Sequence, residues 1–166
     1  EYARLTRGTF SFILLNPPYD GETMVGSGKR MEETFLADLP TTEVLVPGGV
    51  LAYIIPHKQI NERIARHLNG WYQNLQCFLL PEEEYKVFGQ VIILGTRRTD
   101  YVPPTHVKLA EVEAWADGKA ITRWTSIKNE AGKEEMVPTF RPLGHFGAAT
   151  LIRYEIPASP EKGTHG

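Results

Sequence analysis

The 166-residue sequence contains one cysteine, little net charge and no long apolar run. The single cysteine, Cys77, excludes a disulfide within the chain and is typical of a reducing compartment, so we expect a cytoplasmic protein. Cys77 lies in the apolar run of residues 75–80. We therefore interpret it as buried filler rather than as a nucleophile.

The absence of any run of about 18 apolar residues predicts that no helix spans a membrane, and we expect no membrane partner. A net charge of −2 gives no support for a wholly basic nucleic-acid-binding protein, although it leaves room for a local basic groove. Hydrophobic residues make up 42% of the chain and charged residues 23%. This composition is typical of a globular protein that buries one sizeable core.

The most informative stretch is residues 10–19, Phe-Ser-Phe-Ile-Leu-Leu-Asn-Pro-Pro-Tyr. The short apolar run 12–15 is typical of a buried strand in a parallel sheet. Because Pro17 and Pro18 donate no N–H, the strand is expected to end there. Asn16 should then lie at the carboxyl end of a buried strand, which is where open α/β sheets bind ligands.

These residues suit the binding of a planar amine. The amide oxygen of Asn16 and the carbonyl of Pro17 are two acceptors side by side, and together they can accept both protons of an exocyclic amino group. Tyr19 adds a flat face on which a planar base, taken out of its stack, can lie. The alternative is a strand followed by a structural proline turn, but the four-residue combination after an apolar run favours the functional interpretation.

The motif Asn16-Pro17-Pro18-Tyr19 resembles the catalytic motif of the class I S-adenosylmethionine-dependent amino-methyltransferases, especially the N6-adenine DNA methyltransferases. The resemblance implies that these four residues form the catalytic site, with Asn16 and the Pro17 carbonyl on the target amino group and Tyr19 stacked on the base. It also implies S-adenosylmethionine as cofactor and DNA as partner. The motif also serves RNA and protein-glutamine methyltransferases, which remain alternatives, as does a non-catalytic methyltransferase-like module that binds nucleic acid.

The pattern after the motif predicts an α/β fold. Residues 31–39 have helical spacing, residues 50–55 form an apolar strand, and a right-handed crossover between the two strands makes them parallel. Asn61 is expected to cap a further helix. Residues 75–80 and 91–94 predict two strands that pair antiparallel. The resemblance implies a partial Rossmann-like methyltransferase sheet with flanking helices, in which strands equivalent to 4, 5, 7 and 6 lie in that order and the last strand of the chain is antiparallel.

Three further residues are candidates for the site. Lys58 and His57 follow the second strand at the same edge as Asn16, where Lys58 is a candidate phosphate contact and His57 a conceivable general base, although the family needs no dedicated base there. Phe88 precedes the last strand, and the resemblance implies that it packs on the substrate base opposite Tyr19. Core filler is the alternative for Phe88.

The remainder of the chain is less informative. We expect residues 1–100 to be the C-terminal half of a methyltransferase catalytic domain, residues 101–156 a small β-rich extension and residues 157–166 a disordered tail. Residues 106–115 fit either a strand or a short helix. Trp115, Arg123, Trp124 and Lys128 are candidates for a nucleic-acid surface, with a small β core as the alternative.

The sequence lacks the glycine-rich turn and the acidic residue with which this family binds S-adenosylmethionine, so cofactor-binding residues cannot be assigned. We therefore expect the chain to be a fragment of a longer enzyme and to be inactive by itself. The strand of residues 12–15 would then lack a neighbour and present an apolar edge. Self-association through this edge, or its covering by a rearranged segment, is the expected consequence.

Overall fold

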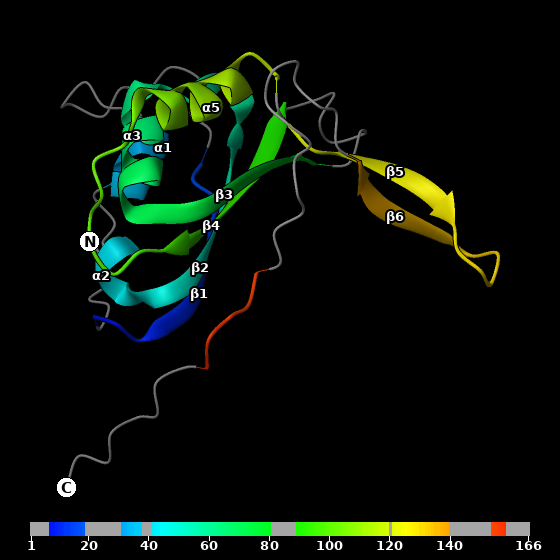
Figure 1. Ribbon diagram of the computed structural model, residues 1–166, viewed down its shortest axis with the longest axis horizontal. Coiled ribbons are helices and arrows are strands. Elements are labelled where there is room, and N and C mark those ends of the chain that lie inside the picture. Colours follow the sequence, from blue (N-terminus) through cyan, green and yellow to red (C-terminus); the bar gives the residue numbers. More distant parts are fainter. Residues whose placement is uncertain are drawn as a thin grey trace, which may run out of the picture.

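The computed structural model describes residues 7–18, 31–37, 41–80, 89–119, 121–139 and 154–158. Figure 1 shows a mixed sheet with helices on one side and a separate hairpin that extends away from it. The sheet consists of β1 (Phe10–Leu15), β2 (Leu45–Pro56), β3 (Tyr72–Leu79) and β4 (Gln90–Arg97). The helices are α1 (Met31–Ala37), α2 (Thr41–Val44), α3 (Glu62–Trp71) and α5 (His106–Ala116), with a 3-10 turn η1 (His57–Gln59). The hairpin pairs β5 (Arg123–Lys128) with β6 (Glu134–Thr139).

The order of the strands confirms the predicted partial Rossmann-like sheet. The strands lie in the order β1-β2-β4-β3, with β1 parallel to β2 and β4 antiparallel to both of its neighbours. In register, Leu15 lies opposite Tyr53, Tyr53 opposite Ile93, and Ile93 opposite Cys77. The last strand of the chain is therefore inserted between two earlier ones, as the resemblance implies.

The core lies between the sheet and its helices. Alternate residues of β2, namely Leu51, Tyr53 and Ile55, are fully buried against Ile64 and Leu68 of α3. Cys77 belongs to the same core, and burial raises the pKa of its thiol, which confirms it as apolar filler.

Two polar side chains, Tyr53 and Asn61, hold the helices on this core. The Tyr53 hydroxyl donates to the backbone carbonyl of Glu32 at 2.9 Å and so joins β2 to α1. Asn61 caps α3 as predicted, because its side chain accepts from the Ile64 N–H at 3.0 Å. The Asn61 amide also donates to the Glu33 carboxylate, which ties the start of α3 to α1.

Strand β1 lies at the end of the described sheet and presents apolar side chains to solvent. Phe10 is 41% exposed, Phe12 42% and Leu14 58%, whereas Leu15 on the other face is buried. The expectation of a buried strand is therefore wrong for the face of β1 that carries these three side chains. Their exposure agrees with the apolar edge that the sequence also predicts. Self-association through it stays a prediction.

The segment after the sheet packs on the same core. Residues 106–115, ambiguous in sequence, form the helix α5, whose first turn is capped by the Thr105 hydroxyl. Leu109, Val112 and Trp115 are buried in the core shared with α3 and β3. The chain then returns to the sheet, where Thr122 exchanges backbone hydrogen bonds of 2.8 and 2.9 Å with the edge of β3. A domain boundary near residue 100 stays a prediction.

Within the region expected to be rich in β structure, Arg123–Lys128 form β5. Residues 154–156, at the end of that region, belong to no strand. The side chains of Arg123 and Trp124, and residues 159–166 of the predicted tail, lie outside the described residues, while Lys128 is exposed. A nucleic-acid surface in this region stays a prediction.

His67 on α3 makes the stability of the fold dependent on pH. Its Nε2 atom is buried and has no hydrogen-bond partner among the described residues, and burial lowers the pKa of His67 from 6.5 to about 4. Below pH 6.5 the unfolded chain takes up the proton first, so the free energy of unfolding falls as the pH drops. The full loss, reached near pH 4, is about 3 kcal/mol.

Urea unfolding of the wild type and of His67→Leu between pH 7.5 and 5 measures this effect. The wild type should lose stability on acidification more steeply than the variant. If the free energy of unfolding falls equally with pH in the two proteins, His67 takes up no proton on unfolding between pH 7.5 and 5.

Candidate functional site

The carboxyl ends of three strands meet at one edge of the sheet. Because β4 is antiparallel to both β2 and β3, strands β1, β2 and β3 all run in the same direction. Asn16 follows β1 directly, and His57 and Lys58 follow β2 in η1. The predicted placement of these three residues at one edge is therefore confirmed.

Within the motif, one residue is buried between two exposed ones. Pro17 is fully buried, whereas Asn16 and Pro18 are exposed. A rigid ring packed in the core fixes the backbone on either side of it, because its φ is locked and it cannot shift without opening the core. The Asn16 side chain and the Pro17 carbonyl, the two acceptors expected to bind an amine, thus lie next to a buried ring. Tyr19 lies outside the described residues, so its stacking role stays a prediction.

His57 is held from two sides. Its Nδ1 lies 2.9 Å from the carbonyl oxygen of Ala116 at the end of α5, and its backbone N–H donates to the Gly89 carbonyl at 2.9 Å. A carbonyl can only accept, so Nδ1 carries the hydrogen and Nε2 is the acceptor nitrogen of the neutral ring. The ring is therefore fixed in orientation and in tautomer at the edge where Asn16 lies.

Gly89 brings the start of β4 against this histidine. Its φ of 61° lies in the left-handed region, and a Cβ there would lie 3.5 Å from Cδ2 of His57. Phe88, the residue before it, is outside the described residues, so its contact with a base stays a prediction. Lys58 is exposed and remains a candidate phosphate contact. The role of Ala116 could not be foreseen, since the sequence does not decide whether residues 106–115 are helical.

No element for the methyl donor is found among the described residues. Strand β1 is followed by Asn-Pro-Pro and β2 by His-Lys-Gln, and no described strand leads through a glycine-rich turn into a helix. The described edge thus supplies acceptors for an amine but no recognisable cradle for a nucleoside cofactor. None of the described helices is both long enough and apolar enough to cross a membrane.

Comparison with known proteins gives one match. Residues 1–133 match the model of an uncharacterised methyltransferase family, DUF6094. The matched range contains the Asn-Pro-Pro-Tyr motif, the whole four-stranded sheet, α5 and β5. Neither the curated proteins nor the solved structures gave a match.

Proposed function

The chain belongs to this methyltransferase family, and from that premise we propose that its Asn16 edge binds the exocyclic amino group of a base, adenine N6 in DNA, for methylation. S-adenosylmethionine is the expected donor, because it is the cofactor that methyltransferases generally use and it supplies an electrophilic methyl group.

One observation supports this proposal: Pro17, directly after Asn16 at the carboxyl end of β1, is fully buried. The Asn16 amide oxygen and the Pro17 carbonyl accept the two hydrogens of the amine. Both N–H bonds are then held in fixed directions, so the nitrogen lone pair has one direction left in which to point. Because such positioning replaces a random encounter, it lowers the barrier without an acid or a base.

A base fits this site better than an aliphatic amide does. Tyr19 comes after β1 in the sequence and Phe88 comes before β4. These two aromatic residues can enclose a planar ring. A glutamine side chain offers no ring to stack on. Lys58, exposed beside His57, is a candidate contact for a phosphate.

A second candidate is a module that binds nucleic acid through the same edge without catalysis. The observation that favours it is the lack of a donor cradle among the described residues. Methyl transfer by the full natural protein separates the two, because only the enzyme transfers a methyl group.

The test is transfer of labelled methyl from S-adenosylmethionine to DNA, RNA and protein in parallel by the full natural protein that contains this chain. Label in DNA is the expected result. Label in RNA or in protein alone would contradict the proposed substrate while keeping the reaction. Cofactor binding without label in any polymer would contradict the enzyme and favour the binding module.

A further inference from the structure

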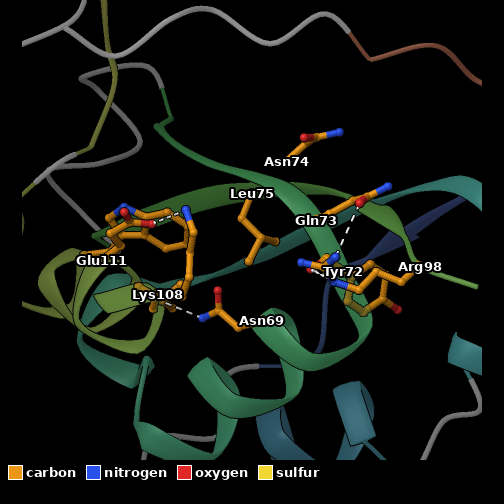
Figure 2. Close-up of a pocket in the computed structure, with 10 residues that line it drawn as sticks. Asn69, Tyr72, Gln73, Asn74, Leu75, Arg98, Lys108 and Glu111 are labelled. Carbon is orange, nitrogen blue, oxygen red and sulfur yellow. Dashed lines mark hydrogen bonds and ion pairs between the residues drawn. The ribbon is translucent and has the colours of Figure 1, made fainter. Parts of the chain in front are cut away.

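A cavity of about 210 Å³ lies at the edge of the sheet opposite to Asn16. Figure 2 shows it between the end of α3, the start of β3 and α5, with Arg98 beside it. Since β1 and β3 run in the same direction, the start of β3 lies a full strand length from the edge that bears the motif. The Arg98 end of the cavity therefore lies away from the motif, while its Trp115 end adjoins Ala116, whose carbonyl contacts His57.

A β-bulge shapes this cavity. Gln73 pairs with Thr96 and Gln76 with Leu94, so β3 contains one residue more than β4 over this interval. Asn74 takes up the extra length in the left-handed region with a φ of 54°, a conformation that asparagine tolerates better than most residues do. In Figure 2 the Asn74 side chain points away from the cavity, whereas Leu75 points toward it.

Gly95 on β4 makes room for this arrangement. A Cβ at Gly95 would lie 2.7 Å from Cδ2 of Leu75, so a larger residue would displace Leu75 from its position at the cavity. On the other side of the bulge, the Tyr154 hydroxyl donates to the Asn74 carbonyl, and burial raises the pKa of that hydroxyl. The bulge is thus contacted by Tyr154, a residue 80 positions away in the sequence.

Arg98 presents an oriented positive charge to the cavity. Its Nε donates to the Tyr72 carbonyl at 3.0 Å, and its Nη1 donates to Oε1 of Gln73 at 3.4 Å. These neutral partners orient the guanidinium plane without neutralising it, and no described carboxylate forms an ion pair with Arg98. A fixed guanidinium without a counter-charge is suited to a carboxylate or another oxyanion.

The side-chain amide oxygen of Asn69 is a hydrogen-bond acceptor at the same cavity. Its side chain is buried, and its Nδ2 donates to the carbonyls of Ala65 at 3.0 Å and Lys108 at 3.1 Å. Both amide hydrogens are thereby used, and Figure 2 shows the amide oxygen pointing toward Leu75 and the Lys108 side chain. A ligand in the cavity needs a hydrogen-bond donor to satisfy this oxygen.

The charges of the lining favour a monoanion. Lys108 Nζ lies 3.0 Å from a carboxylate oxygen of Glu111, so this pair is neutral and Arg98 leaves a single positive charge. A dianionic phosphate ester would bring one more negative charge than the lining offers, and it would also lie near Glu111. A carboxylate matches both the single charge and the planar guanidinium fork.

We propose that this cavity binds a small monocarboxylate that carries a hydroxyl donor, the chemistry of a hydroxy acid. The carboxylate contacts Arg98, the donor reaches the Asn69 amide oxygen, and the short carbon body lies against Leu75 and Trp115. The proposal does not depend on the methylation chemistry at the opposite edge.

The test is titration of the chain with glycolate, a carboxylate with one hydroxyl, followed by NMR of two side chains. The Nε–H of Arg98 and the Nδ2 hydrogens of Asn69 should shift together and saturate. Acetate, which lacks the hydroxyl, should bind at least about threefold more weakly. Absent or non-saturating shifts with glycolate would overturn the proposal.

Variants make the test independent of a failure to fold. Arg98→Gln should weaken glycolate binding by at least about tenfold. Glu111→Gln removes a nearby negative charge at an exposed position and should tighten binding by about fivefold, and Lys108→Gln should weaken it.

Lys133→Gln, at an exposed lysine on the β5–β6 turn, is the matched control and should leave the affinity unchanged. Equal affinities in Glu111→Gln and wild type would overturn the site. If a short DNA duplex, but not glycolate, changed the NMR signals of the Arg98 and Asn69 side chains, the proposed carboxylate site would also be overturned. That result would indicate a phosphodiester contact instead.

Discussion

Replacing Asn16 by alanine is expected to reduce methyl transfer by about 10²–10³-fold, the loss typical of removing one fixed polar contact to the reacting group. The Asn16 side chain is exposed, so truncating it leaves the buried ring of Pro17 unchanged. The amine would keep only the Pro17 carbonyl as acceptor and could rotate about that single bond. The loss should therefore appear in kcat, with little change in cofactor binding.

Asn16→Asp is the matched control for this prediction. It retains an acceptor oxygen at the same position, so it should keep more activity than Asn16→Ala. Thermal unfolding of both variants should match the wild type. An alanine variant that transfers methyl at the wild-type rate would show that Asn16 has no role in the reaction.

Replacing Trp115 by alanine is expected to destabilise the sheet as a whole, by about 3–5 kcal/mol. Trp115 lies on α5, beyond the sheet in sequence, yet it is only 5% exposed and belongs to the core of α3 and β3. If this core unfolds as one unit, hydrogen exchange should accelerate not only in α5 but also in β4, one of the two inner strands.

Val107→Ala on the same helix provides the comparison. Val107 is 60% exposed, so this change should alter the free energy of unfolding by no more than about 0.5 kcal/mol. Faster exchange confined to residues 106–116 in Trp115→Ala would indicate that α5 belongs to a separate extension, with a boundary near residue 100.

The order of the sheet could be anticipated because each of its strands carries its own local signal. The apolar run before Asn16-Pro17, the apolar strand ending at Pro56 and the closely spaced last pair each predict a strand from neighbouring residues alone. The resemblance then supplies their order. The predicted third strand began three residues late, because α3 passes directly into β3 at Tyr72 without a turn.

The helix α5 and the cavity could not be anticipated in this way. The apolar residues of α5 do not form one clean stripe, since Val107 faces solvent while Leu109 and Val112 are buried. The cavity depends on a bulge at Asn74 and on residues that are far apart in the sequence, such as Asn69 and Lys108, which are 39 residues apart. Contacts of this kind are set by tertiary packing and leave no pattern in a short window of sequence.

The most direct measurement of the central claim identifies the atom that carries the new methyl group. Two fixed acceptors, the Asn16 amide oxygen and the Pro17 carbonyl, can bind an NH₂ group but not a ring nitrogen or a ring carbon, which bear no pair of hydrogens. Digestion of the methylated polymer to nucleosides and mass spectrometry against N6-methyl, N1-methyl and C5-methyl standards should show N6-methyladenine. Methyl on a ring atom would contradict the proposed role of this edge.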